Sequence, residues 1–317
     1  GEEMTLNIIV RRKTQSNSGH DREPIESIRE NAPKLFASQD RAVSVSDYEA
    51  LLINQFGYID AISIWGGEEE IDPQPGKVFL AIKPNKNLYL TENQKTEIVK
   101  YLKTKSFSSI TYEFKDVVFI RGVINAQYTY DPTLVGRQFT HERLENEIIE
   151  SIHKFTDRNL KKFNDKLNLS ALTKYVMNER LYLTSIDFDV KLTYDFDTRV
   201  KDITSVYEVD IANPIEQITG GGAIKSTPFL VYNGTSSNRY YITDDGKGNI
   251  KLISDLDMVN KKIGSIDYER GYIQFSDILP VDNKITFTIA PDSRNLKNTK
   301  NNLILIERDN IFININK

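Results

Sequence analysis

The sequence of 317 residues contains no cysteine, only three histidines and a single tryptophan. The absence of cysteine excludes disulfides, thiolate metal sites and cysteine nucleophiles together, and it fits the reducing cytoplasm in which we expect the chain to be made. No apolar run approaches the roughly 18 residues of a membrane-spanning helix. The apolar run Leu6–Val10 is too short for a signal-peptide core and leads directly into Arg11-Arg12-Lys13. We therefore expect neither membrane insertion nor a signal peptide.

The three histidines form no catalytic or metal-binding pattern. His20 lies in a polar segment, and His141 and His153 are twelve residues apart, too far for a pair of ligands on one helical turn. The spacing of a phosphate-binding loop is absent, and no serine lies in a nucleophile elbow. The run Gly220-Gly221-Gly222 lacks the dinucleotide-binding spacing. We therefore predict a protein that is not an enzyme, with no catalytic residue, no cofactor and no metal site.

Three local features keep other functions open. The acidic run 68–72 contains Glu68 and Asp72, carboxylates that a glycan-cleaving protein would use, although neighbouring charges in a loop more often form a solvated turn. Two tyrosine pairs, Tyr128 with Tyr130 and Tyr240 with Tyr241, could stack bases or sugars, although strand tyrosines more often pack in a core. The run 244–249 resembles a calcium loop without its final glutamate, and a hairpin turn is the better interpretation. Glycan binding or glycan cleavage therefore remains the alternative function.

The composition describes a folded, acidic protein. Hydrophobic residues make up 39% of the chain and aromatic residues 10%, proportions that are too high for a disordered chain. A net charge of -4 and a pI near 5.6 give no broad basic surface, so we expect no nucleic-acid partner. The length allows two domains, each with its own core.

Residues 1–198 alternate between helical and strand patterns. Capping boxes at Ser46 with Glu49 and at Thr91 with Gln94 predict two helix starts, and Pro33 is expected to end an earlier helix over residues 23–31. Further helices are predicted after Thr140 and Ser170, and strands over residues 5–10, 59–65, 78–82, 117–130 and 186–194. The last strand alternates strictly between apolar and polar residues, which indicates a sheet with one covered face. We predict an α+β fold with helices on one side of a mostly antiparallel sheet.

The pattern changes near Val200, where helical periodicity ends. Short strands separated by polar turns are predicted over residues 205–211, 229–232, 239–243, 250–253, 272–275, 285–289, 303–307 and 311–315. Regularly spaced short strands are typical of a small all-β sandwich or barrel. We therefore predict two domains, an α+β core over residues 1–198 and a β-rich domain over residues 199–317.

Residues 18–84 carry an ordered series of short motifs. The series consists of Asp21-Arg22-Glu23-Pro24, Ile28-Arg29, Ala32-Pro33, Phe36, Gln39-Asp40-Arg41-Ala42-Val43, Ser46-Asp47-Tyr48, Trp65-Gly66-Gly67 and Pro75-Gly76-Lys77-Val78. In this order the motifs resemble the baseplate J-like family of contractile-tailed bacteriophages and related injection machines. The β-rich part, including residues 266–273, resembles the wedge proteins that build the inner ring of T-even-type phage baseplates. The family's long helical N-terminal part has no counterpart here, and residues 1–3 precede Met4, so we expect a C-terminal fragment of a longer chain.

The resemblance implies a structural virion protein of the tail baseplate, assembled in the host cytoplasm. Such a subunit would act in tail assembly and in the baseplate rearrangement that triggers sheath contraction and DNA ejection. The implied partners are further copies of the chain, as a dimer within a ring, and other wedge and hub-proximal tail proteins. A nucleic-acid partner and an inserted membrane are not implied. The alternative then becomes a virion-associated glycan-binding or glycan-cleaving protein.

Candidate self-association residues lie near the C-terminus. The predicted strands over residues 303–306 and 311–315 are apolar on at least one face, and little sequence follows to cover them. Exposed strand edges of this kind pair with another chain or aggregate. Leu303, Leu305, Ile311 and Ile313 are therefore the candidates for contact between copies of the chain.

Overall fold

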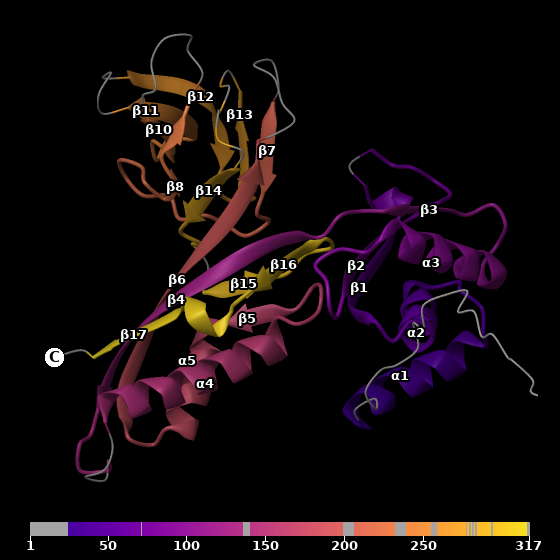
Figure 1. Cartoon of the computed structure of the whole chain (residues 1–317), viewed down its shortest axis with the longest axis horizontal. Coiled ribbons are helices and arrows are strands. Elements are labelled where there is room, and N and C mark those ends of the chain that lie inside the picture. Colours follow the sequence, from indigo (N-terminus) through magenta and orange to yellow (C-terminus); the bar gives the residue numbers. More distant parts are fainter. Residues whose placement is uncertain are drawn as a thin grey trace, which may run out of the picture. The chain divides into compact units, whose positions relative to one another are not determined.

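The computed structural model describes residues 25–70, 72–135, 140–198, 206–231, 239–254, 259–276, 278, 280, 282, 284–292 and 294–315. The chain divides into two compact units, which are Gly1–Asp60 with Ile64–Glu113 and Ala61–Ser63 with Phe114–Lys317. Figure 1 shows the elements of both units coloured along the sequence. The strand predicted over residues 5–10 lies outside the described residues.

Within the described residues, the first unit combines three α-helices with a sheet in the strand order β1-β2-β3. Its elements are α1 (Ile25–Ser38), α2 (Val45–Gln55), β1 (Ile59–Gly66), the 3-10 turn η1 (Gly67–Glu69), β2 (Lys77–Pro84), α3 (Glu92–Lys105) and β3 (Thr111–Phe114). Thr91 caps α3 as predicted: Thr91 Oγ1 accepts from the Gln94 N–H at 3.4 Å, and Gln94 Oε1 accepts in return from the Thr91 N–H at 2.9 Å. The predicted apolar stripes are buried, with Leu51 and Leu52 in α2 and Ile98 in α3.

Two helix boundaries in this unit differ from the prediction. The capping box of α2 uses Ser44 and Asp47 rather than Ser46 and Glu49: the Ser44 N–H donates to Asp47 Oδ2 at 2.8 Å, and the Asp47 N–H donates to Ser44 Oγ at 3.3 Å. The chemistry is the one predicted, placed two residues earlier. Helix α1 continues through Pro33 instead of ending before it. A proline removes one backbone hydrogen bond from a helix, and packing of α1 against α2 offsets that loss.

The second unit is built on a 12-stranded sheet in the order β16-β4-β6-β14-β8-β10-β11-β12-β13-β7, with β17 paired to β4 and β9 paired to β10. Its helical elements are α4 (His141–Asn159), α5 (Leu169–Glu179) and the 3-10 turn η2 (Arg308–Asn310). Its strands are β4 (Val118–Tyr130), β5 (Lys166–Asn168), β6 (Leu183–Asp197), β7 (Tyr207–Asp210), β8 (Ile224–Ser226), β9 (Phe229–Leu230), β10 (Arg239–Asp244), β11 (Asn249–Ser254), β12 (Val259–Asp267), β13 (Tyr272–Phe275), β14 (Lys284–Ile289), β15 (Asn295–Lys297), β16 (Asn302–Leu305) and β17 (Ile311–Ile315).

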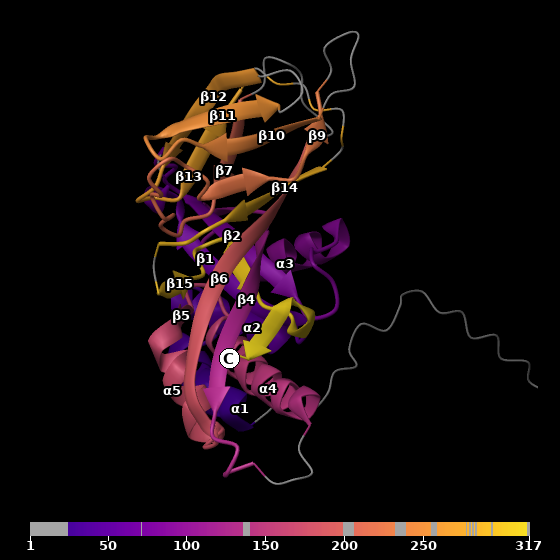
Figure 2. The same cartoon turned by 90° about the vertical axis from the view of Figure 1, so that its left-hand side faces the viewer.

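The long strands β4 and β6 pair antiparallel and form the centre of this unit. Their burial alternates as the sequence predicted, with Ile124, Ala126 and Tyr128 of β4 fully buried between polar neighbours. Strands β16 and β17 run parallel to β4, while β5 pairs separately with β15. Figures 1 and 2 both show α4 and α5 lying along β4 and β6. The prediction of a mixed α+β fold is confirmed.

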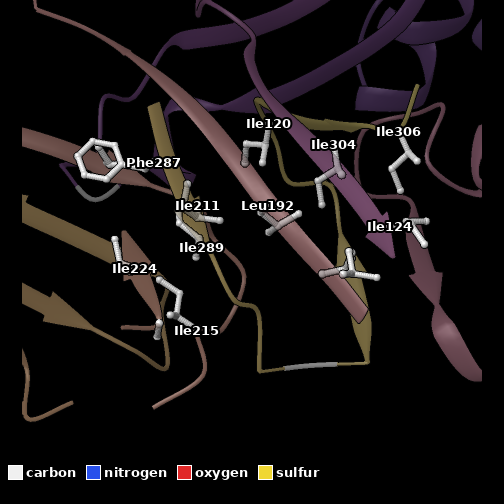
Figure 3. Close-up of a cluster of buried hydrophobic side chains, with 14 of the residues drawn as sticks. Ile120, Ile124, Leu192, Ile211, Ile215, Ile224, Phe287, Ile289, Ile304 and Ile306 are labelled. Carbon is white, nitrogen blue, oxygen red and sulfur yellow. The ribbon is translucent and has the colours of Figure 1, made fainter. Parts of the chain in front are cut away.

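One hydrophobic core joins residues from both sides of the boundary predicted at 198/199. The core includes Ile120 of β4 and Leu192 of β6 together with Phe287 of β14 and Ile304 of β16, all fully or almost fully buried (Figure 3). Strand β6 also pairs antiparallel with β14 along six residues of each strand. The junction itself, residues 199–205, lies outside the described residues. The division into 1–198 and 199–317 stays a prediction, and the sheet and core are continuous across it.

Within the described residues, no α-helix follows α5. The strands predicted over residues 272–275 and 311–315 are present with the predicted ends, and the other strands predicted in this part of the chain are present with shifted ends. Residue 232, the end of one predicted strand, lies outside the described residues. Five strands carry too weak a pattern to have been predicted, namely β3, β5, β8, β12 and β15. Three of them are only three residues long, and β12 contains Asn260-Lys261-Lys262, which breaks the apolar alternation.

Candidate assembly surfaces

The candidate self-association residues lie on β16 and β17, where both strands pair with β4. Leu303 and Ile311 are only 1% and 4% exposed, so their side chains pack inside their own subunit. Leu305 and Ile313 are half-buried, and Ile313 packs against the hydrophobic core. The register places Ile311 opposite Ile124 and Ile313 opposite Ala126. The sequence could not show that the C-terminal strands return to a strand almost two hundred residues earlier.

The outer edge of β17 is the part of this region that stays accessible. Among the described residues, β17 pairs with β4 on one side and with no strand on the other. Helix α4 contacts β17, and Phe312, on the face opposite Ile311 and Ile313, is 51% exposed. An open strand edge beside an exposed phenylalanine is a surface that another chain can extend or cover. Phe312 was not among the predicted candidates because it points away from the apolar face that led to them.

The acidic run 68–72 forms a turn around a buried glycine. The carbonyl of Gly67 accepts from the backbone N–H groups of Glu70 and Gln74, at 3.4 and 2.9 Å. Glu70 accepts from the indole Nε1–H of Trp65 at 2.6 Å, so this carboxylate fixes the turn to the end of β1. Glu68 and Asp72 are exposed. The run is therefore a solvated turn, as predicted for neighbouring charges in a loop. Ile71 within it lies outside the described residues.

His141, His153 and two of the candidate tyrosines take packing positions, while His20 lies outside the described residues. Tyr128 and Tyr240 are buried, and burial raises the pKa of Tyr128 to about 12. The ring of His141 lies edge-on to Tyr130 with centroids 6.1 Å apart, while His153 lies on α4 with its Nδ1 buried. Within the described residues no group of three or more His, Asp or Glu side chains is placed to hold a metal ion. None of the helices that the structure describes has the length and apolar character of a membrane span.

Asp195 of β6 joins three strands on the solvent side of the sheet. Its carboxylate accepts from both terminal nitrogens of Arg121 on β4 at 2.8 Å, from Lys284 Nζ at 2.7 Å and from Thr286 Oγ1 at 2.8 Å on β14. Burial opposes the charge, yet hydrogen bonds from Lys284, Thr286 and Arg121 lower the pKa of Asp195. This cluster links residues before and after the predicted boundary at 198/199, so it fixes β4, β6 and β14 as one body.

Asp244 has the corresponding role in the β10–β11 hairpin. Its buried carboxylate accepts from the N–H groups of Gly222, Ile224 and Gly246 at 2.8, 3.0 and 3.1 Å and from the Tyr268 hydroxyl at 2.7 Å. The predicted hairpin turn is confirmed, since β10 and β11 pair antiparallel from Tyr241 to Asp244. The glycine run 220–222 lies in a loop of this region, where the Asp244 bond to Gly222 holds it.

An apolar stripe on α1 was not singled out from the sequence. Ile25, Ile28 and Phe36 follow helical spacing and are 63%, 44% and 88% exposed. Val43, in the turn that follows, is also exposed. The spacing was visible in the sequence, but the expected end of the helix before Pro33 separated Phe36 from the other two residues.

Part of the chain is similar to known proteins. Residues 44–114 match the family described as baseplate structural protein gp6, C-terminal domain I. The chain is similar to baseplate wedge protein gp6 of Enterobacteria phage T4, with 30% identity over 162 residues, which is 51% of this chain and 24% of the relative. The chain thus spans about a quarter of the length of this curated relative.

A solved structure titled "Cryo-EM structure of the anti-feeding prophage (AFP) baseplate, 6-fold symmetrised" aligns with a TM-score of 0.37 at 14% identity, covering 53% of this chain and 38% of that chain. A likeness of that level carries no argument about fold or function. The sequence matches are more informative, and the family match over residues 44–114 falls almost wholly within the first unit. They show that part of this chain is similar to baseplate wedge proteins.

Proposed function

We propose that this chain is a structural subunit of a contractile phage tail, a baseplate wedge protein of the J-like type that forms the inner ring within the virion. The observation that carries the proposal is the 30% identity over 162 residues to a baseplate wedge protein. The match of residues 44–114 to the C-terminal domain I of such proteins agrees with it. The chemistry of the described residues agrees, because their clustered carboxylates, Asp195 and Asp244, are engaged in fixing strands.

The structure suggests how the subunit takes part in the baseplate rearrangement. The second unit has one core and one large sheet, locked across β4, β6 and β14 by the Asp195 cluster. Packed cores are bistable rather than continuously deformable, so large rearrangements usually occur between rigid bodies. In the proposed mechanism the second unit moves as a rigid body when the sheath contracts, and the contacts between subunits change.

The proposed self-contact uses the open edge of β17. Within the described residues this edge has no strand partner, and Ile313 and Phe312 present apolar surface on its two faces. Two copies related by a twofold axis would pair edge to edge, as a dimer within the ring. Other wedge proteins and hub-proximal tail proteins would complete the ring. A contact of modest area can depend on these partners for its stability.

The mass of purified complexes tests the proposed function. The chain is co-expressed with the neighbouring tail proteins of its own phage, and native mass spectrometry measures what forms. We expect complexes that contain more than one copy of the chain together with other wedge proteins. A chain that stays alone when those partners assemble with each other would contradict the proposal.

A further inference from the structure

A row of lysines crosses the solvent face of strands β8, β10, β11 and β12. Thr243 of β10 pairs with Lys225 of β8 on one side and with Lys251 of β11 on the other, and Lys251 pairs with Lys262 of β12. Residues opposite each other on neighbouring strands point to the same face. Like charges directly opposite each other destabilise a sheet, so the Lys251–Lys262 pair is a repulsion that the fold retains. An anion bound on this face would relieve that repulsion.

The same face is hollowed beside the row. The hollow has a volume of about 520 Å³, and its lining includes Lys225, Lys247, Lys251, Tyr241 and Ile253. Lys225 Nζ lies 5.6 Å from the centre of the Tyr241 ring, and Lys251 Nζ lies 3.9 Å from Asp245 Oδ2. Lys247 is exposed at the turn. The floor is therefore a small aromatic and aliphatic patch with three ammonium groups beside it. The lining also contains the carboxylates of Asp244 and Asp245, which accept hydrogen bonds from backbone N–H groups.

The rim of the hollow is rigidly built. The loop of glycines 220–222 and the turn at Gly246 pack so closely that a Cβ at Gly221 would lie 2.1 Å from the Asp244 carbonyl oxygen, and one at Gly246 would lie 2.2 Å from the Ile218 carbonyl oxygen. The buried carboxylate of Asp244 binds the N–H groups of both segments, at Gly222 and Gly246. A preformed rim lowers the entropy that a ligand must lose on binding.

We propose that this hollow binds an acidic, extended segment of a protein partner in the baseplate. The inference rests on the proposed function and adds the chemistry of one contact surface to it. Lysines are flexible point charges that adapt to carboxylates at variable positions, whereas specific phosphate sites favour the rigid fork of arginine, and no arginine is among the lining residues. The patch at Tyr241 and Ile253 accommodates one apolar side chain of the segment. Electrostatic attraction to the lysine row sets its position.

Fluorescence anisotropy with the whole chain tests the proposal. The probe is a labelled peptide with the sequence of residues 66–76, which contains four carboxylates, and a version with glutamine and asparagine in their place is its control. We expect the acidic peptide to bind and the neutral control peptide not to bind. The affinity for the acidic peptide should fall at least tenfold in the double variant Lys225→Gln, Lys251→Gln. It should also fall at high salt, because salt screens exposed charges. Lys100→Gln with Lys103→Gln, exposed lysines of α3, should leave binding unchanged.

Two results would overturn the proposal. One is equal peptide binding by the wild type and the Lys225/Lys251 variant, or none by either. The other is tighter binding of an oligogalacturonate or a short DNA duplex than of the peptide, which would assign the hollow to another class of ligand. The variant is expected to fold, because it removes one member of the repulsive Lys251–Lys262 pair. Lys247→Glu, at the exposed turn, provides a second test with the same expected loss.

The complex-mass measurement separates this inference from the proposed function. The lysine surface would be refuted, and the structural role left intact, by two results together. The Lys225→Glu, Lys251→Glu variant would form complexes of wild-type mass, and the wild type would not bind the peptide. A wild-type chain that forms no complex with neighbouring tail proteins would refute the structural role. Loss of one partner from the complexes of the charge-reversed variant alone would support the inference and identify that partner.

Discussion

Replacing Asp244 by asparagine is the sharpest test of how the β-rich part of the second unit is held. The carboxylate accepts four hydrogen bonds, from the N–H groups of Gly222, Ile224 and Gly246 and from the Tyr268 hydroxyl, and the side chain is buried. Asparagine keeps one acceptor oxygen and places an amide NH₂ where the other accepts. The Tyr268 hydroxyl can rotate to accept from that NH₂, but the Gly246 N–H then faces a donor.

The magnitude follows from these four bonds. Hydrogen bonds to a charged group contribute about 1.5–3 kcal/mol each and neutral ones about 0.5–1.5 kcal/mol. The substitution therefore loses one charge-assisted bond and weakens the other three, while the lower cost of burying a neutral amide offsets part of the loss. We expect the free energy of unfolding to fall by about 2–4 kcal/mol, which corresponds to a thermal midpoint roughly 10 °C lower.

Urea denaturation followed by circular dichroism measures this change. Asp189→Asn is the matched control, since that carboxylate is 66% exposed and its ion pair with Lys191 spans 3.9 Å. The effect of this substitution should stay below about 0.5 kcal/mol. Tyr268→Phe should lower the free energy of unfolding by about 1 kcal/mol in the wild type. In the Asp244→Asn background its effect should be much smaller, because the Tyr268 hydroxyl acts through Asp244. An Asp244→Asn protein as stable as the control would refute the assigned role of this carboxylate.

Four further results are expected. Gly67→Ala should destabilise the first unit by about 1–3 kcal/mol, because the added Cβ would lie 2.0 Å from a backbone oxygen. Gly76→Ala should cost only about 1 kcal/mol of backbone strain. Thermal denaturation of the two variants measures the difference. Hydrogen bonds, above all that from the Asn249 side chain, lower the pKa of Asp245 to about 2. The contribution of this carboxylate to the free energy of unfolding should therefore be complete above about pH 4 and should be lost as the pH falls through 2. A midpoint near pH 4 in a carboxyl NMR titration would contradict this. A screen against peptidoglycan and polysaccharides should show no turnover, and turnover abolished by Glu68→Gln would contradict the structural role. Light scattering across a concentration series should show weak self-association that Ile313→Lys removes. A chain that is strictly monomeric, and whose Ile313→Lys variant still joins the baseplate, would exclude β17 from the interface.

Local patterns predicted most elements because their signals lie within one segment. The Thr91–Gln94 capping box, the buried stripe of α3 and the alternation in β4 all follow from neighbouring residues. The capping box of α2 was misplaced because Ser44 and Ser46 both offer a hydroxyl at an acceptable distance from an acidic residue. Only the geometry shows that Asp47, rather than Glu49, reaches back to the chain.

Long-range pairing could not be predicted in the same way. Nothing local in Ile311–Ile315 indicates a parallel partner at Ile124–Tyr128, and nothing local in β14 indicates that it pairs with both β6 and β8. The same limit explains the self-association candidates. Leu303 and Ile311 are apolar because they complete their own core, a role that the sequence cannot distinguish from contact with a second chain. The lysine row was equally hidden, because its members come from three separate strands.

The sheet topology also constrains where the proposed baseplate rearrangement could act on this chain. Strand β4 lies early in the second unit and pairs with the last two strands, while β6 continues into the pairing with β14. Moving the C-terminal strands relative to β4 would break a parallel ladder and open the core around Ile120 and Ile304. The Lys225–Lys251–Lys262 face and the outer edge of β17, by contrast, lie outside that core and can gain or lose partners without disturbing it. If the chain acts in the proposed rearrangement, these two surfaces are where its contacts are expected to change.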